Sequence, residues 1–327
     1  MMGSRTLRLL AAGVGAAGLV AGVAALAAFK SGASNNLVIV LASFAPLLLL
    51  ATVVGAIVSA VARRWLLLAA SVVVVGLGAW AYGPLFVAGA SGEPAVDASG
   101  PSIRVMQANI MVGSADPEAL VQTVRERGID VLTIQELTDP SVEALRAAGL
   151  EKLLPHQFLA PYATGGGGGG IYSRLPLANG SRVDGMALTN LVTEVDAGLA
   201  RPVIVYDVHP VPAYIAPAAH WTEDFDRLRD ALDSTAGSDN VIVSGDFNAT
   251  YSHSKFRDLR RGGYVDAADQ LGAGILPTYP TDKRYPAVVG IDHILTKGAA
   301  ATSLERIAIV GSDHHGLIAD VQLSNGS

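Results

Sequence analysis

The sequence predicts an α/β domain preceded by three transmembrane helices. Half of its 327 residues are apolar and only 16% are charged, an excess of apolar residues for a protein that folds in water. The excess lies in the first ninety residues, whereas the remainder alternates strand-like and helix-like segments. We therefore expect a membrane domain over residues 1–90, a linker over residues 91–100 and one folded domain over residues 101–327.

Three apolar runs in the first part contain no charged side chain: Leu9–Phe29, Leu37–Ala62 and Leu66–Ala90. Each run reaches the roughly 20 residues that a helix needs to cross a bilayer of about 30 Å. The first run could instead be a signal peptide, because Arg5 and Arg8 precede it. It is, however, longer than the roughly 7–15 apolar residues of a signal core, which favours a span.

The positive charges beside these runs predict their orientation. Arg5, Arg8, Arg63 and Arg64 lie at one side of the predicted membrane, and Lys30 lies at the other. The positive-inside rule then places the amino terminus in the cytoplasm and the carboxyl-terminal domain outside. We expect a multi-pass protein of the cell membrane with an extracytoplasmic domain, for which the lipid bilayer is a partner.

The linker is predicted by small and turn-forming residues between the two parts. In the folded domain, apolar runs predict strands and amphipathic stretches predict helices, so we expect a two-layer core covered by helices. The expected strands are Ile103–Met106, Val131–Ile134, Val192–Val195, Val203–Val208, Val241–Val243, Ile291–Leu295, Ile307–Val310 and Leu317–Leu323. The expected helices are Pro117–Arg127, Ser141–Ala148 and Thr222–Ser234.

The run Gly165–Gly170 is too flexible for regular structure and predicts a mobile surface loop. The alternative is a loop that cradles a phosphate or acts as a lid.

Charge and cysteine content narrow the function. Residues 101–327 contain 18 of the 23 Lys and Arg residues and 27 of the 29 Asp and Glu residues, a net charge of about −9. A surface that neutralises many phosphates should be basic, so this balance disfavours long nucleic acids as partners. The chain has no cysteine, which excludes disulfides and thiol chemistry.

Short polar motifs follow the strand-like runs throughout the domain. They supply carboxylates for a divalent cation, a His–Asp pair for proton transfer, and neutral donors for a phosphoryl oxygen. Metal-assisted attack of water on a phosphate ester needs these groups. The motifs are Gln107–Asn109, Gln135–Glu136, His209, Gly245–Asn248, Ile291–His293 and Ser312–His314.

Asp246 and Asn248 stand two residues apart after an apolar run, so an extended backbone would point both side chains into one pocket. Asp246 could align an attacking water, and the Asn248 amide could donate to a phosphoryl oxygen. The alternative is an Asx-type turn that uses both side chains for backbone capping. The accompanying motifs favour the catalytic role.

Glu136 ends another apolar run, where an uncompensated carboxylate would be costly to bury, and is therefore a candidate metal ligand. Asn109 would offer an amide oxygen to the same cation, although an isolated Asn at a strand end more often forms a turn. Oxygen ligands of this kind favour Mg²⁺ or Mn²⁺ over zinc.

His314 is the candidate general base, since imidazole titrates near neutral pH. Asp313 precedes it, and Asp292 could fix its tautomer and stabilise the imidazolium. We expect His293 and His315 to point away, because neighbours on a strand alternate faces. A zinc site built from several His residues lacks the expected ligand spacing.

His209 ends a strand at a stiff proline-rich turn and would donate to the phosphate. A lone His at a strand end is usually structural, and the other motifs favour a functional role here.

From about Ile103 to Leu323 the sequence resembles the endonuclease/exonuclease/phosphatase superfamily, which has the deoxyribonuclease-I-like fold. The elements N, QE, SRLPL, H-P, GDFNAT, DHIL and SDHH occur in the expected order. The resemblance implies a four-layered α/β sandwich and Mg²⁺ dependence. It implies site roles for Asn109 and Glu136 at the metal with Asp313 nearby, for His209, Asp246 and Asn248 around phosphate and nucleophile, and for a His314–Asp292 pair.

The layout of three spans before such a domain resembles actinobacterial membrane proteins of the VanJ type, which are linked to teicoplanin resistance. Unlike the nuclease branches, the domain shows no basic, aromatic surface element for gripping a duplex. We therefore expect a membrane-anchored phosphoesterase acting on a phosphorylated lipid or cell-envelope intermediate at the outer face of the membrane. The alternatives are an extracellular nuclease and a non-catalytic, membrane-tethered binding module.

Overall fold

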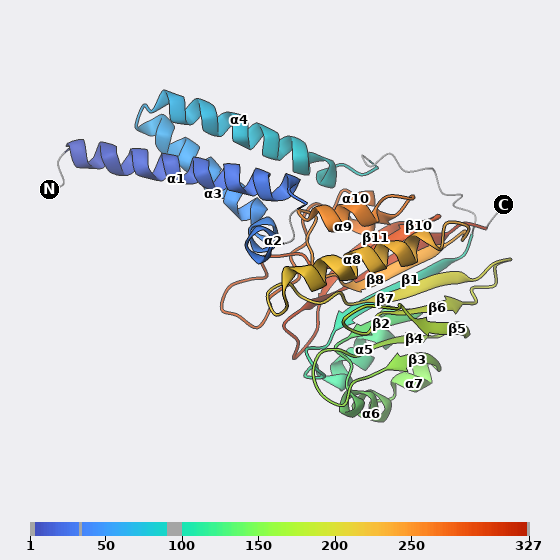
Figure 1. The fold of residues 1–327 in the computed structure, drawn as a ribbon. Coiled ribbons are helices and arrows are strands. Elements are labelled where there is room, and N and C mark those ends of the chain that lie inside the picture. The colour runs from blue at the N-terminus through green and yellow to red at the C-terminus, as the bar shows by residue number, and fades with distance from the viewer. Residues whose placement is uncertain (1–3, 33–34, 90–99, 326–327) are drawn as a thin grey trace.

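The computed structural model describes residues 4–32, 35–89 and 100–325. Its amino-terminal part is a helical bundle that extends to one side of a larger α/β domain (Figure 1). The predicted linker, residues 91–100, lies outside the described residues except for Gly100. The helices of the bundle are α1 (Ser4–Lys30), α2 (Asn36–Ser43), α3 (Ala45–Val61) and α4 (Trp65–Tyr82), followed by the short 3₁₀ helix η1 (Gly83–Phe86).

Two segments of the bundle, Thr6–Lys30 and Trp65–Phe86, are each helical, long and apolar enough to cross a membrane. The predicted second span is not one straight helix, because α2 and α3 meet at 64°. The break lies at Phe44, two residues before Pro46, which has no N–H to continue the helix. The described part of the bundle therefore has two helices that are able to cross a membrane, or three if the bent pair is one span.

Small residues let α1 and α3 approach closely. A Cβ atom on Gly18 would lie 2.8 Å from the Ala51 carbonyl oxygen, so only glycine fits there. The Thr52 hydroxyl donates to the Gly18 carbonyl oxygen at 2.9 Å. Small residues and hydroxyl-to-backbone bonds of this kind are typical of helix packing in membranes.

The α/β domain contains two six-stranded sheets (Figure 1). The first has the order β11 (Ala299–Ala308), β12 (His315–Leu323), β1 (Ser102–Asn109), β2 (Val131–Gln135), β4 (Gly169–Ser173), β3 (His156–Ala160). The second has the order β5 (Leu177–Arg182), β6 (Leu191–Val195), β7 (Val203–Val208), β8 (Val241–Asp246), β10 (Asp292–Lys297), β9 (Val265–Asp266). The helices are α5 (Pro117–Arg127), α6 (Asp139–Ala147), α7 (Leu150–Leu153), α8 (Ala218–Asp233), α9 (Ser254–Leu259) and α10 (Ala267–Gln270).

The side chains of each sheet alternate between two hydrophobic layers, as a pleated strand requires. In β1, Val105 packs into the layer between the sheets, whereas Met106 packs against α5 and α6. In β8, Ile242 packs between the sheets, whereas Val243 packs against α8 and α9. The layers therefore run helix, sheet, sheet, helix, as expected for a four-layered sandwich.

The expected strands omit the edge strands β3, β5 and β9, the neighbouring strand β4, and all of β11 except its last two residues. Ala299–Ala308 is rich in polar and small residues and has no apolar run. Ile307–Val310 was predicted as a strand, but β11 ends at Ala308. Edge strands need fewer buried side chains, so their periodicity is weak.

The predicted glycine loop is also wrong in part. Gly169 and Gly170 begin β4, and residues 167–170 are buried. Gly169 and Gly170 pair with Gln135 and Ile134 of β2, so the end of the run is part of the first sheet. Glycine is required because other backbone and side chains approach closely here.

Candidate active site

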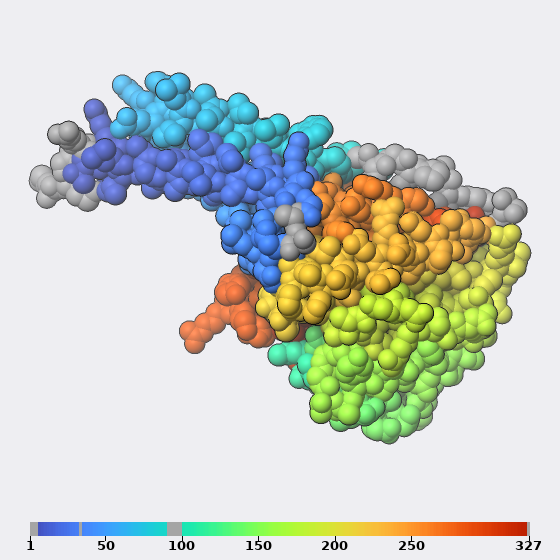
Figure 2. Space-filling model, viewed as in Figure 1, coloured from blue at the N-terminus to red at the C-terminus, as the bar shows by residue number. Residues whose placement is uncertain are grey.

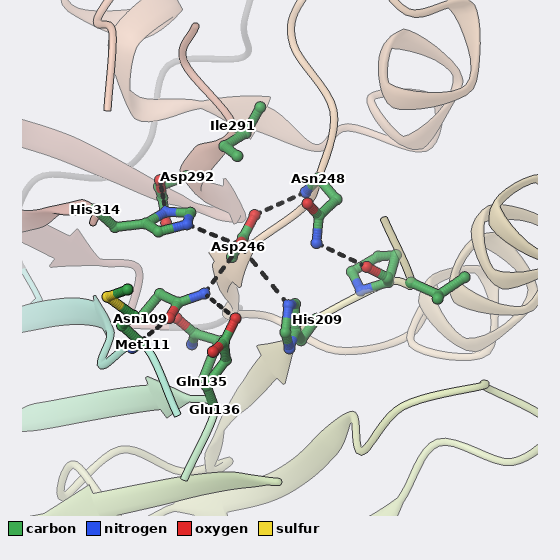
Figure 3. Close-up of polar contacts among 12 residues, drawn as sticks. Asn109, Met111, Gln135, Glu136, His209, Asp246, Asn248, Ile291, Asp292 and His314 are labelled. Carbon is green, nitrogen blue, oxygen red and sulfur yellow. Dashed lines mark hydrogen bonds and ion pairs between the residues drawn. The ribbon is translucent and has the colours of Figure 1, made fainter. Parts of the chain in front are cut away.

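The ends of parallel strands in both sheets meet at one place (Figure 3). In the first sheet, β1 and β2 are parallel, with Asn109 at the end of β1 and Glu136 directly after β2. In the second sheet, β7 and β8 are parallel, with His209 after β7 and Asp246 at the end of β8. The face-to-face packing of the sheets brings these side chains together.

His314 and Asp292 form a buried pair at the centre of this site. The Nδ1 atom of His314 lies 2.9 Å from Oδ2 of Asp292, and its Nε2 atom lies 3.7 Å from Oδ2 of Asp246. Burial by itself would lower the pKa of His314, but the carboxylates of Asp292 and Asp246 outweigh it and raise this pKa to about 10. The ring of Tyr279 lies 4.8 Å from that of His314 and covers it.

Asp246 lies between two imidazoles. Its Oδ2 atom is 3.7 Å from Nε2 of His209 as well as from Nε2 of His314 (Figure 3). Burial raises the pKa of Asp246 and lowers that of His209. His209 is therefore held as a neutral donor, while His314 is held as the charged partner.

Asn109 connects the two sheets. Its Nδ2 atom donates to Oε1 of Glu136 at 3.2 Å and to Oδ2 of Asp246 at 3.1 Å. The second oxygen of Glu136 accepts from the backbone N–H of Val112 at 2.8 Å. Burial raises the pKa of Glu136. Glu136 also has a φ of 61°, a left-handed conformation that costs energy for a side chain of this kind.

Asn248 differs from the expectation of a continuing strand. The strand ends at Asp246, and Asn248 adopts a φ of 48°. Its backbone N–H donates to Oδ1 of Asp246 at 2.8 Å, the Asx-type turn that was the alternative interpretation, while Oδ2 of Asp246 faces the site. The Asn248 amide donates to the Pro210 carbonyl at 3.0 Å and therefore lies beside the turn that holds His209.

Several predicted residues lie outside the central cluster. Asp313 is half-buried, and its charge contributes to the raised pKa of Glu136. His293 pairs with Asp266 at 2.6 Å, and His315 contacts the Ile307 carbonyl oxygen, so both point away as expected.

The donor set fits a divalent cation. Within the described part of the chain, ligand atoms of Asp246, Asp292 and His314 lie within 4.8 Å of one another, a group that could hold a metal ion. Glu136 adds a further, half-buried carboxylate next to Asp246 through Asn109. Clustered carboxylates need a compensating positive charge, and oxygen donors are those that Mg²⁺ and Mn²⁺ prefer. The assignment of Asn109, Glu136 and Asp313 as the ligands stays a prediction.

A buried polar chain behind the site was given no role by the sequence reading. The amide of Gln107 donates to Oδ1 of Asp292 and to Oε1 of Gln135, both at 2.7 Å. Gln135 in turn donates to Oδ1 of Asp207 at 2.6 Å. Gln107 thus orients the carboxylate that holds His314. Its position two residues before Asn109, on the same face of β1, was the available signal.

The run Gly165–Gly170 packs against two carboxylates: that of Asp207 in the buried polar chain and that of Glu136 in the site. A Cβ atom on Gly166 would lie 3.1 Å from the Glu136 carboxyl carbon, and one on Gly169 would lie 2.6 Å from Oδ2 of Asp207. The Gly170 N–H donates to Asp207 at 2.8 Å. The run is therefore a close-packed wall beside the site, at least over its buried part, where a mobile surface loop was expected.

Gly245 also has a measurable packing role. A Cβ atom at this position would lie 2.0 Å from the Val208 carbonyl oxygen across the β7–β8 pair. We expect Gly245→Ala to lower the free energy of unfolding by about 1–3 kcal/mol or more, because the neighbouring strand must move. Gly237→Ala is the matched control, since no atom lies within 4 Å of its added methyl group. Thermal or denaturant unfolding of both variants checks this, and equal stabilities would contradict it.

Comparisons with known proteins agree with this architecture. Residues 106–314 match the sequence model described as "Endonuclease/Exonuclease/phosphatase family". Humanised D. rerio TDP2 is similar in structure at a TM-score of 0.56 and 16% identity, over 67% of this chain and 98% of that one. An endonuclease/exonuclease/phosphatase from Beutenbergia cavernae is similar at a TM-score of 0.52 and 20% identity, over 68% of this chain and 72% of that one.

A third similar structure, the endonuclease/exonuclease/phosphatase from Bacteroides vulgatus, has a TM-score of 0.53 and 16% identity, over 68% of this chain and 100% of that one. At these identities the structural similarity shows a common fold. No curated protein sequence matches the chain.

Proposed function

Because the chain belongs to the endonuclease/exonuclease/phosphatase family, we propose that it is a membrane-anchored, divalent-metal-dependent phosphoesterase. The observation that carries this proposal is the buried His314–Asp292 pair, which faces Asp246 beside His209 and Asn109. Family members hydrolyse phosphate esters, and the proposal extends this activity to a multi-pass protein with an extracytoplasmic domain.

Different residues of the site would orient the water, transfer the proton and bind the phosphate during hydrolysis. Asp246 would orient the attacking water from its place between the two imidazoles. His314 would accept a proton from that water, while Asp292 fixes the Nδ1–H tautomer of His314. His209, neutral in the buried site, would donate to a phosphoryl oxygen. The Asn248 amide is a second donor and would exchange its bond to Pro210 for one to the substrate.

A cation would be held by the Glu136 carboxylate, close to Asp246. The Asn109 amide, whose nitrogen faces both carboxylates here and whose oxygen accepts from the Met111 N–H, would turn its oxygen toward that cation. When bound, the cation would polarise the phosphate and offset carboxylate charge, which lowers the pKa of His314 toward the range of a general base. Gln107 would keep Asp292 in position during this exchange.

We propose a phosphorylated lipid or cell-envelope intermediate, such as a polyprenyl phosphate or pyrophosphate, as the substrate. The domain is acidic, which weakens attraction to long polyanions, while its apolar helices hold it near lipid headgroups. A nuclease is the alternative, since a D. rerio TDP2 structure contains a single-strand DNA product.

Turnover by the full-length protein in liposomes tests the substrate class. We expect hydrolysis with Mg²⁺, measured as inorganic phosphate from polyprenyl pyrophosphate or as a phosphomonoester product from phospholipid, and none after chelation of the metal. Plasmid DNA serves as the competing substrate in the same vesicles. Mg²⁺-dependent cleavage of DNA without turnover of any lipid phosphate would favour the nuclease.

The orientation of the chain has its own test. A reporter that fluoresces only in the cytoplasm, fused after Ser327, is expected to stay dark, because the cations beside the spans place the carboxyl terminus outside. The same reporter at the amino terminus is the control and should be bright. A bright carboxyl-terminal fusion would reverse the proposed orientation.

A further inference from the structure

The membrane helices form direct hydrogen bonds with the α/β domain. The Nε2 atom of His253 lies 2.9 Å from the Ile39 carbonyl of α2, and Tyr82 of α4 bonds to Ser252 at 2.7 Å. The Arg257 guanidinium donates to the Phe29 carbonyl of α1 at 2.6 Å and lies 3.9 Å above the Phe29 ring. These contacts come from three helices, so they fix the orientation of the domain relative to the bundle.

The segment that bonds to the helices, residues 249–257, begins directly after the turn formed by Asp246 and Asn248. Residues 249–253 follow Asn248 without a break, and the indole N–H of Trp221 donates to the Asn248 carbonyl at 3.1 Å while its ring packs on that of His253. The direction in which the active site opens is therefore set by the same contacts that hold the helices.

The rim of the site is also attached to α2. Asn36, at the start of α2, donates to the carbonyl oxygens of Ala213 and Ala216. Between these two residues, Tyr214 and Ile215 are 64% and 73% exposed. Tyr214 lies beside Tyr279, whose ring covers His314. Residues 213–216 thus connect α2 to the tyrosine ring that covers His314.

A second rim element carries a net charge of +1, from Lys283 and Arg284 against Asp282, which pairs with Lys283 at 2.7 Å. Residues 282–286 are all exposed and include Lys283, Arg284 and Tyr285, the last 53% exposed. The base of this loop is fixed next to the catalytic residue, because Thr281 bonds to the carbonyl oxygens of Ser312 and Asp313. The loop forms the orange-red projection of Figure 2, on the side toward which the helices run.

The direction of the loop 282–286 is informative because the axis of the helical bundle indicates where the bilayer would lie. In Figure 1 the loop reaches, along the direction of the bundle, past the carboxyl-terminal end of α1. Leu37 and Val40 of α2 are exposed on the same part of the molecule, at 69% and 40%. A basic and aromatic tip at this level suits the headgroup region of a bilayer, where Tyr and Lys or Arg are typical anchors.

We propose that these two rim elements, residues 213–216 and 282–286, form a membrane-contact rim. This rim rests on the anionic headgroups of the leaflet on the side of the α/β domain. The active site then opens onto the bilayer surface, and a lipid phosphate enters from the leaflet. This route for the substrate rests on the proposed function, whereas the contact of the rim with lipid does not.

The absence of cysteine makes the contact directly measurable. Single cysteines, Tyr285→Cys and Ile215→Cys, would be labelled with a small fluorophore in the full-length protein. The protein would be reconstituted in equimolar phosphatidylcholine and phosphatidylglycerol with a headgroup-labelled quencher lipid. Ser181→Cys in the exposed strand β5, on the part of the domain far from the bundle, is the matched control (Figure 1).

We expect strong quenching at positions 285 and 215 and little at position 181. Lys283→Gln and Arg284→Gln should each weaken insertion of the loop by roughly fivefold, since one basic residue contributes about that much at an anionic surface. Equal quenching at positions 285 and 181 would overturn the proposal. Quenching that is unchanged in pure phosphatidylcholine would overturn the assignment of anionic headgroups.

Turnover separates this inference from the proposed function. Tyr285→Ser should reduce kcat/KM for a lipid phosphate in liposomes while leaving a soluble phosphodiester unaffected. Rim quenching without hydrolysis of any lipid phosphate would support the contact and count against the proposed substrate. Hydrolysis of lipid phosphates without rim quenching would do the reverse.

Discussion

Replacing His314 with alanine is expected to lower kcat by roughly 10²–10⁴-fold, because a positioned general base contributes about that much. His314 is 4% exposed and pairs with Asp292 at 2.9 Å, so the imidazole is held in one orientation. Steady-state rates on a soluble phosphodiester with saturating Mg²⁺ measure the loss. Added imidazole should restore part of the rate, which would separate proton transfer from a purely structural role.

The neighbouring histidine provides the control. His315 is half-buried and contacts the Ile307 carbonyl oxygen instead of the cluster, so His315→Ala should keep most of the activity. Circular dichroism and thermal unfolding would establish that both variants fold. A folded His314→Ala protein with near-normal rates would remove His314 from the mechanism.

The second large effect concerns the metal. Glu136→Ala is expected to abolish Mg²⁺-dependent turnover and to weaken Mn²⁺ binding, because it removes the half-buried carboxylate that Asn109 connects to Asp246. Electron paramagnetic resonance of added Mn²⁺ gives a readout that does not depend on activity. Glu223→Ala, an exposed carboxylate on α8, is the control.

Mn²⁺ binding also distinguishes two positions for the ion. If Glu136→Ala binds Mn²⁺ normally while Asp292→Asn does not, the ion lies in the group formed by Asp246, Asp292 and His314. That result would contradict the role proposed for Glu136. It would also change the role of Asp292 from an orienting partner of His314 to a ligand.

Much of the candidate site could be predicted because its residues occupy strand ends. Parallel neighbours in a sheet end at one edge, so Asn109 with Glu136, and His209 with Asp246, could each be expected to lie together from the order of motifs alone. The structure brings all of them to His314 and Asp292 (Figure 3). Their catalytic and metal-binding roles stay predictions.

Contacts between distant elements could not be read in this way. Gln107 lies on β1 and Asp292 on β10, in different sheets, and their bond exists only because the sheets pack face to face. The buried half of the glycine run was read as a loop because composition reports flexibility and not the neighbours that exclude a side chain. The bend at Phe44 likewise interrupts a run whose apolar composition is continuous.

The sequence by itself determined the local features of this protein: two parts of different polarity, the order of the main strands and helices, and the set of polar residues at strand ends. Hydrophobic periodicity and turn chemistry act over a few residues, which is why they can be read along the chain. Tertiary structure alone decided how the bundle attaches to residues 249–257, and how the two sheets bring the polar residues of the site together. The physical reason is that these contacts join residues about two hundred positions apart, and their geometry depends on how whole layers pack.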